Sequence, residues 1–422
     1  MEPKPTLPLD ILLHIIDLLA RSSGDSMDPN TIRSLQILSL ACKFMVPLCR
    51  KHLFSSLKLN SNSKTEGYND LLSKSPDIAC YTKKLFLLCN PIINHDFLDI
   101  LKKHSSLHWI TLTGSKSLSW NDFPESMQSS LVSLIKLPTL SSLSIYSFTM
   151  FPAAAIAGCS NLNYLQVVGA KLTPPEINQV IPPRSKIPSP ELLDFNADIY
   201  GIEVLLNSAN LDGGGSGPIV DFSRLQKAML IVVSQRDVDL VYEMIKMTTR
   251  LEFFGIRACE NGESAFSTYR LKFDREKNFF LKKVTQPVDL GGLSECLKVN
   301  AYRTLKLLNI GITVVGDDYD PLCVFNRELR FIAGNNILES VYLTLRHQED
   351  VSSRIESEDW SNFDSVLTES GAFPMLRLVS VEIWWREVSR NLSDQENNLT
   401  AAKFPRLVES SAVFFDFFSE IQ

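Results

Sequence analysis

A short apolar pattern that recurs along most of the chain constrains the fold more than any other feature. Each copy has an apolar residue, two intervening residues, a second apolar residue, one intervening residue and a third apolar residue. The closing positions alternate as in a strand with one buried face, and helix-like stretches separate the copies. Strands that alternate with helices predict a parallel sheet, because parallel neighbours need a crossover connection. The clear copies are Leu107-Ile110-Leu112, Leu140-Leu143-Ile145, Leu162-Leu165-Val167, Leu251-Phe254-Ile256, Leu305-Leu308-Ile310, Leu338-Val341-Leu343 and Leu376-Val379-Val381.

The distance between copies varies. Clear copies follow one another at intervals of 22 to more than 50 residues, and weaker copies lie at Leu192 and Phe195 and at Leu225, Ala228 and Leu230. The pattern therefore favours an α/β fold built as an irregular leucine-rich-repeat-like solenoid, in which each unit adds one short strand to a parallel sheet and buries its apolar positions against the next unit. An ordinary α/β domain with several parallel strands is the alternative, because leucine is common and the pattern is short.

Three segments interrupt the predicted repeats. Residues 172–190 hold six prolines and are expected to form a stiff surface loop. Residues 212–218 are a glycine-rich loop, and no Gly-Lys-Ser/Thr follows that would indicate phosphate binding. Residues 266–286 hold two alternating runs around a charged turn, which predict a β-hairpin insertion. The aromatic run at residues 413–418 is expected to cover the last repeat, whose edge would otherwise be exposed.

The N-terminal stretch at residues 7–19 is more apolar than a surface helix needs to be. Pro8 suits the first turn of a helix, and Asp10, His14, Asp17 and Arg21 fall on one side of it as a solvated stripe. Every residue between these polar positions is apolar, whereas a surface helix normally carries a single apolar stripe.

The following segment, residues 31–54, is also more apolar than a helix with a single apolar stripe. Asp28 and Pro29 predict a helix N-cap and first turn, and Pro47 predicts that this helix kinks or ends near Lys43, so that a third short helix runs to His52. Two apolar stripes are predicted. The first contains Ile32, Leu35, Leu38, Cys42, Met45 and Cys49, and the second contains Ile37, Leu40 or Ala41, Phe44 and Leu48.

Three short helices in about fifty residues make a marginal core when they stand alone. The excess of apolar surface has two interpretations. The helices are buried within a larger domain, or one face forms a small bundle while another docks onto a partner. Periodicity alone leaves both interpretations open.

Several short runs in this segment carry a family resemblance: Leu7-Pro8, Asp10-Ile11, the apolar ladder of Ile15, Ile16, Leu18 and Leu19, the run from Leu38 to Lys43, and the run from Pro47 to Phe54. They resemble an F-box, the module by which substrate receptors bind the Skp adaptor of Skp–cullin–F-box ubiquitin ligases. The closing run is similar to that of receptors from mushroom-forming fungi. The family commonly has Trp or Phe two positions after the Cys-Lys pair, where this chain has Met45 beside Phe44. Met fills irregular apolar pockets, so the departure is tolerable, although it could weaken adaptor binding.

The resemblance implies an N-terminal three-helix F-box at residues 1–56 and a solenoid at residues 57–422, since the fungal receptors also have degenerate repeats. It implies a substrate-recognition subunit that binds a Skp-type adaptor, through it a cullin, and an unidentified protein target on the repeat region, in the cytoplasm or nucleus. The adaptor-binding residues that we infer are Leu7, Pro8, Ile11, Ile15, Leu18, Leu38, Cys42, Met45 and Pro47.

Composition excludes several other classes of protein. The chain of 422 residues is 45% hydrophobic and 21% charged, as expected for a folded protein, and its net charge of -6 argues against nucleic acid as a partner. The eight cysteines are scattered singly, which predicts reduced, buried thiols rather than a zinc knuckle or a disulfide framework. No signal peptide is expected, and no apolar run approaches the roughly 20 residues that span a bilayer.

No local motif indicates catalysis, a metal or a cofactor. His104 and His108 have helical spacing, but no third ligand is indicated, and the acidic loop at residues 317–320 lacks the glycine and distal glutamate of a calcium site. We therefore expect an interaction protein without catalytic residues of its own. Two rival classes remain open: a scaffold whose F-box-like helices only cap the solenoid, and an enzyme whose catalytic groups lie far apart in sequence.

Overall fold

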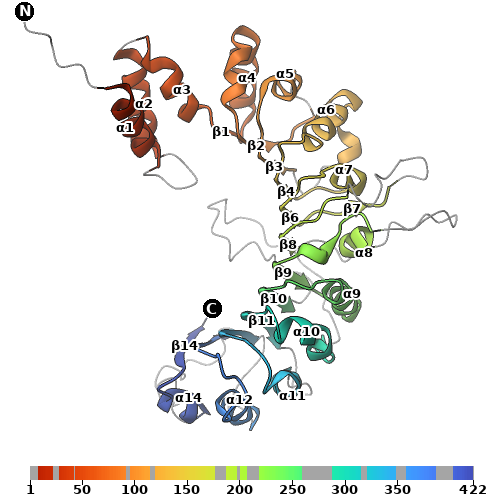
Figure 1. The fold of residues 1–422 in the computed structure, drawn as a ribbon. Coiled ribbons are helices and arrows are strands. Elements are labelled where there is room, and N and C mark those ends of the chain that lie inside the picture. The colour runs from red at the N-terminus through yellow and green to blue at the C-terminus, as the bar shows by residue number, and fades with distance from the viewer. Residues whose placement is uncertain are drawn as a thin grey trace, which may run out of the picture. The chain divides into compact units, whose positions relative to one another are not determined.

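The computed structural model of the chain describes residues 8–21, 28–41, 43–91, 96–114, 119–175, 187–196, 200–206, 218–258, 288–314, 321–347, 358–385 and 403–421. The chain divides into two compact units, Met1–Asn163 with Gly169–Pro188, and Tyr164–Val168 with Ser189–Gln422. The predicted boundary at residue 56 falls inside the first unit and remains a prediction. The protein is mixed α/β with a large parallel sheet, as the recurring pattern predicts (Figure 1).

The first unit begins with three helices and continues as alternating strands and helices. Its four main strands pair in chain order, β1-β2-β3-β4, and all three pairs are parallel. A short parallel pair, β5 (Phe151–Pro152) with β7 (Leu172–Thr173), lies apart from these strands. The other elements are α1 (Leu9–Arg21), α2 (Pro29–Ala41), α3 (Met45–Leu53), β1 (Ser56–Leu59), α4 (Asn62–Lys74), η1 (Pro76–Tyr81), β2 (Lys84–Leu88), α5 (Phe97–His104), β3 (Trp109–Thr113), η2 (Trp120–Asp122), α6 (Glu125–Ile135), β4 (Ser142–Tyr146) and α7 (Ala153–Ala157).

The second unit follows the same plan with eight described strands. They pair in the order β6-β8-β9-β10-β11-β12-β13-β14, all parallel, so that strands consecutive in the chain are neighbours in the sheet. The elements are β6 (Tyr164–Val168), β8 (Leu192–Asn196), α8 (Tyr200–Leu206), η4 (Phe222–Arg224), β9 (Lys227–Val232), α9 (Gln235–Lys246), β10 (Phe253–Ala258), α10 (Leu293–Ala301), β11 (Leu307–Val314), α11 (Pro321–Ile332), β12 (Ser340–His347), α12 (Asp359–Thr368), β13 (Leu378–Trp385), α14 (Pro405–Glu409) and β14 (Phe414–Ile421).

The apolar pattern sets the register between neighbouring strands. Leu308 of β11 lies opposite Phe254 of β10 and Val341 of β12, and Ile310 lies opposite Leu343. None of these five side chains is more than 1% exposed. Equivalent positions of successive copies thus stack into continuous buried rows. The register is strongly specified, because a shift of one residue would turn each row to the opposite face of the sheet.

The weak copy that we placed at Leu192 and Phe195 begins two residues earlier than predicted. Leu193, not Leu192, lies opposite Leu165 of β6, and Leu193 is 3% exposed whereas Leu192 is partly exposed. The first position of this copy is therefore Pro190, which is also buried. The pattern was missed because proline replaces the usual leucine there.

The aromatic C-terminal run forms strand β14, which pairs with β13 and so covers the edge of that strand, as expected. Phe415 and Phe417 of β14 lie opposite Val379 and Val381 of β13 and extend these rows as partly exposed side chains. Phe404, which is fully buried ahead of α14, packs against both rings. The predicted hairpin at residues 266–286 and the glycine-rich loop, apart from residue 218, lie outside the described residues, and so do residues 176–186 of the proline-rich loop.

Among the described cysteines, four are buried and two are exposed, and none is in a disulfide. The Cys159 thiol donates to the carbonyl oxygen of Ile135 at 2.7 Å, and burial raises the pKa of this thiol to about 12. Burial also raises the pKa of the Cys89 thiol. Both thiols are therefore held in the unreactive protonated form.

We expect alkylation to separate these cysteines. At pH 8, iodoacetamide should modify the exposed Cys80 and Cys323 at least tenfold faster than Cys89 and Cys159, because a raised pKa lowers the thiolate fraction and burial blocks access. Peptide mass spectrometry of timed samples measures the rates, and the same labelling in urea is the control that should equalise them. Equal rates in the native protein would contradict the buried placement.

Candidate functional site

The candidate site is the surface of the N-terminal helical bundle, which packs around a small apolar core. Ile16 of α1, Leu35 of α2, and Met45 and Cys49 of α3 form its core, and each is at most 7% exposed. Partly buried apolar side chains surround this core, namely Leu12, Leu38, Leu48 and Leu53. The three helices therefore share one small apolar centre.

Local signals in the sequence define the helix ends as predicted. The Asp28 carboxylate accepts hydrogen bonds from the backbone N–H groups of Asn30 (3.1 Å) and Thr31 (3.2 Å), which is N-cap geometry. The hydrogen bond from the Asn30 N–H is the main cause that lowers the pKa of Asp28. Helix α2 ends at Ala41, and Pro47 lies in the first turn of α3, where its missing N–H removes no bond.

One predicted solvent-facing residue of α1 has a structural role. Asp10 and His14 are exposed, whereas the Asp17 carboxylate lies 2.8 Å from Nε2 of His52 and 3.7 Å from Nζ of Lys51. This contact ties α1 to the C-terminal end of α3.

Two apolar stripes remain on the outside of the bundle. On α1, Ile11, Ile15 and Leu18 are 44%, 42% and 52% exposed, at spacings of four and three residues. We call these three residues the α1 stripe. Because residues spaced by three or four lie on one face of a helix, they form a continuous strip.

The second strip is more exposed. On α2 and just beyond it, Ile37, Leu40 and Phe44 are 61%, 86% and 44% exposed, and we call them the α2 stripe. A leucine at 86% exposure contributes almost nothing to the packing of its own chain. Large apolar side chains gathered in this way are typical of a surface that binds another protein.

The inferred adaptor-binding residues divide into three groups. Pro8, Pro47 and the whole α1 stripe are exposed. Met45 is a core residue at 7% exposure and Leu38 packs partly buried against the core, so these two side chains stabilise the bundle rather than face outward. Leu7 and Cys42 lie outside the described residues.

The α2 stripe was absent from the inferred adaptor-binding set, although its spacing was visible in the sequence. Periodicity separated the two stripes of residues 31–54 but gave no means to decide which of them faces the core. The first stripe supplies the core through Leu35, Met45 and Cys49, whereas its predicted member Ile32 is 36% exposed.

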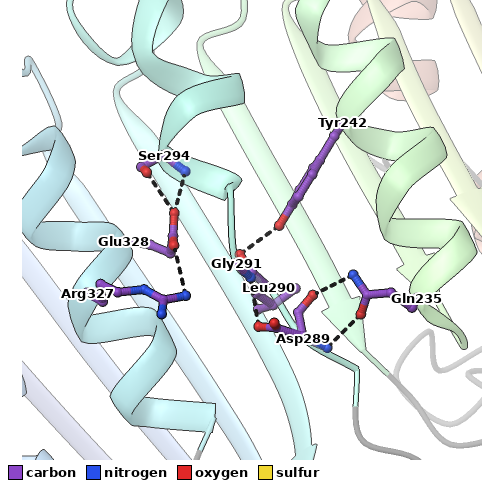
Figure 2. Close-up of polar contacts among 8 residues, drawn as sticks. All are labelled: Gln235, Tyr242, Asp289, Leu290, Gly291, Ser294, Arg327 and Glu328. Carbon is purple, nitrogen blue, oxygen red and sulfur yellow. Dashed lines mark hydrogen bonds and ion pairs between the residues drawn. The ribbon is translucent and has the colours of Figure 1, made fainter.

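A second group of polar residues lies in the second unit, between α9, α10 and α11 (Figure 2). The Gln235 side-chain amide donates to the backbone oxygen of Asp289 at 3.0 Å and accepts from its N–H at 2.9 Å. The Tyr242 hydroxyl donates to the carbonyl oxygen of Leu290 at 2.7 Å, and burial raises the pKa of this hydroxyl. These contacts anchor the turn that leads into α10.

A buried carboxylate in the same group caps that helix. Glu328 of α11 is 4% exposed, and its Oε2 accepts from the Ser294 N–H at 2.9 Å and the Ser294 hydroxyl at 2.7 Å. Nη2 of Arg327 lies 3.6 Å from Oε1 of Glu328. A negative charge at a helix N-terminus is favourable, so this carboxylate has a sufficient structural explanation.

Replacing Glu328 by alanine should destabilise the second unit by about 2 to 4 kcal/mol, because two charge-assisted hydrogen bonds are lost and the α10 N-terminus is left buried without an acceptor. Glu328→Gln should cost less, since the amide oxygen can still accept. Urea unfolding of the two variants measures both effects. A loss below about 0.5 kcal/mol for the alanine variant would contradict the capping role.

Other candidate sites have no structural support within the described part of the chain. No group of three or more His, Cys, Asp or Glu residues there suits a metal ion. His104 is exposed at the end of α5, and Nδ1 of His108 lies 2.9 Å from the carbonyl oxygen of Thr139. The acidic loop at residues 317–320 lies outside the described residues.

No family model matches the sequence, and none of the curated proteins compared with it is similar enough to count as a relative. In the described part of the chain, none of the helices has both the length and the apolar character required to cross a bilayer.

Proposed function

We propose that this chain is a substrate-recognition subunit of a Skp–cullin–F-box ubiquitin ligase. The α1–α3 bundle is an F-box that binds a Skp-type adaptor, and through the adaptor a cullin. The strand–helix repeats that follow are a leucine-rich-repeat-like solenoid that binds a protein target. The proposal places the protein in the cytoplasm or nucleus, where these ligases act.

The observation that carries the proposal is the pair of apolar stripes on a bundle that already has a complete core. The α2 stripe reaches 86% exposure at Leu40 while Ile16, Leu35 and Cys49 are at most 1% exposed. The apolar excess of the N-terminal segment therefore remains on the surface after the helices have packed. A partner that covers both stripes would remove it from water.

The size of such an interface is realistic. A standard protein–protein interface covers roughly 800 Å² on each partner and is dominated by a few buried anchors. Six large apolar side chains on two helices supply anchors of this kind. Resemblance to the F-box, in the residues quoted above, selects the Skp adaptor among possible partners.

The proposed mechanism is positional. The chain holds a target on one module and the ligase on another, so the reaction between them becomes effectively intramolecular. No side chain of this chain takes part in ubiquitin transfer.

Co-expression with a Skp-type adaptor tests the proposal. The expected result is a stoichiometric complex that survives size-exclusion chromatography, whereas the chain expressed alone should aggregate or bind detergent through its exposed stripes. A chain that is monodisperse alone and ignores the adaptor would instead support the scaffold in which these helices only cap the repeats.

A further inference from the structure

We propose that two copies of this chain associate through the outer edge of β14, which pairs antiparallel with β14 of the second copy about a two-fold axis. Strand β14 belongs to the second unit. The association goes beyond the proposed function, because neither the adaptor surface nor ubiquitin transfer takes part in it.

Strand β14 is the last strand of the sheet and has an open outer edge. Among the described residues it pairs with β13 alone. The N–H of Phe414 donates to the carbonyl oxygen of Arg377 at 2.8 Å, so the backbone of Phe414 points toward β13. Backbone groups alternate in direction along a strand, and those of Phe415 and Phe417 therefore point away from β13. They offer donors and acceptors with which another strand can pair.

Aromatic side chains flank this edge on both faces of the sheet. On one face, Phe414 and Phe418 are 68% and 46% exposed. On the other face, Phe415 and Phe417 pack against Phe404 and still remain partly exposed, whereas the valines opposite them on β13 are fully buried. A strand added to the outer edge would bury all four rings further. Long, exposed, apolar edges of this kind pair readily with another chain.

The sequence of β14 is complementary to itself. Residues directly opposite each other in an antiparallel pair point to the same face of the sheet. A two-fold axis at Asp416 sets Phe414 against Phe418 of the second copy. It also sets Phe415 against Phe417 of the second copy, and the symmetry repeats both pairs. A shift of the axis by one residue in either direction would set Asp416 against a ring, so the axis at Asp416 is favoured.

Backbone and side chains agree on this register. The backbone groups of Phe415 and Phe417 point outward in both copies, so the residues that face each other across the axis also exchange hydrogen bonds. The pairs of rings on both faces contribute further, because aromatic pairs directly opposite each other stabilise neighbouring strands. A second copy of this chain therefore satisfies the edge without any other partner.

Asp416 is the unfavourable element of the register and keeps the dimer weak. It is exposed and faces Asp416 of the second copy, in a pair whose Cα atoms are about 4.5 Å apart. Like charges directly opposite each other destabilise a strand pair. A strand of eight residues also forms a small contact compared with the roughly 1,600 Å² of a standard interface. We therefore expect a reversible dimer that forms at micromolar concentrations.

Sedimentation velocity of the full chain, with its adaptor when that complex forms, tests the proposal from low to high micromolar concentration. Asp416→Asn should tighten the dimer about three- to fivefold, because it removes the repulsion between the two carboxylates. Phe414→Glu should weaken it at least tenfold, because it sets a carboxylate against Phe418 of the second copy. The matched controls are Asp239→Asn on α9 and Phe331→Glu on α11, which make the same exchanges at exposed positions outside the strand.

A cysteine at the axis tests the register. Asp416→Cys places two thiols on Cα atoms about 4.5 Å apart, which is within the range for a disulfide. Mild oxidation of this variant, in a chain whose exposed Cys80 and Cys323 are replaced by serine, should give a covalent dimer. Asp239→Cys in the same background should give none.

Three outcomes would overturn the proposal. These are monomers of both the wild type and Asp416→Asn at every concentration, equal effects of the β14 variants and their controls, or failure of Asp416→Cys to form the covalent dimer. Association that Leu40→Glu abolishes and Phe414→Glu leaves unchanged would run through the α2 stripe, and would also overturn it.

Hydrogen exchange of the wild-type chain decides if Phe414→Glu fails to fold. Slower exchange of the amides of residues 414–418 at high than at low protein concentration would support the proposal. Exchange at those amides that does not depend on concentration would overturn it.

Discussion

Exchange of Leu40 for glutamate is expected to weaken adaptor binding about 100-fold, which corresponds to about 2.8 kcal/mol. Leu40 is the most exposed member of the α2 stripe, at 86%. In the complex its side chain would enter an apolar pocket of the adaptor, and a buried, unpaired carboxylate there is strongly unfavourable. The free chain should be unaffected, because surface substitutions usually change stability by less than about 0.5 kcal/mol. Titration of immobilised adaptor with purified chain measures the affinity.

The matched control for Leu40→Glu is Val299→Glu. Val299 is an exposed apolar residue on α10, at 52%, and lies in the second unit. The change in charge and hydropathy is similar, but no docking is proposed there. Leu18→Glu on the α1 stripe should weaken adaptor binding by a comparable factor. If all three variants bind the adaptor as the wild type does while their unfolding curves are unchanged, neither stripe is the adaptor surface.

Exchange of Phe254 for alanine is expected to lower the free energy of unfolding of the second unit by about 4 kcal/mol. Phe254 is fully buried in β10, between Ala228 on β9 and Leu308 on β11. Its large ring fills space that the small Ala228 leaves open, and the backbone of a sheet paired on both sides cannot move in to close the cavity. Urea unfolding followed by far-ultraviolet circular dichroism measures the loss.

Phe331 provides a control of the same chemistry. It lies on α11 with its side chain 66% exposed, so Phe331→Ala removes the same atoms without creating a cavity. Its expected cost is below about 1 kcal/mol. Equal losses for the two variants would show that the buried rows do not dominate the stability of this unit.

The sequence anticipated the strands better than the loops because burial imposes a strict period on strands. The apolar pattern located the strands and their register wherever leucine, isoleucine or valine filled the three positions. It failed at Pro190, where proline occupies the first position, and at the C-terminal run, where phenylalanines hid the alternation between Phe415 and Phe417, which extend the buried rows, and the exposed Phe414 and Phe418. An alternating pattern cannot be recognised in the sequence when the residues on both faces of a strand are apolar.

The candidate site shows the same limit. Local sequence signals correctly predicted the helix N-cap at Asp28 and the helix end before Pro47, because each depends on a few neighbouring atoms. The contact between Asp17 of α1 and His52 of α3 joins residues that are 35 positions apart, and no local rule reveals such a pair. Periodicity also cannot decide which of the two stripes of residues 31–54 faces the core, so Met45 was inferred to be a surface residue although it lies in the core, and Leu40 was not singled out.

The order of strands in the second unit also bears on how it folds. Within the second unit, each described strand pairs with the strand that precedes it or follows it in that unit. Nearest-neighbour strand contacts allow nucleation at any adjacent pair, followed by propagation in both directions. Under mechanical tension the same topology would release one strand at a time from an end, so that extension proceeds in small steps rather than in one cooperative rupture.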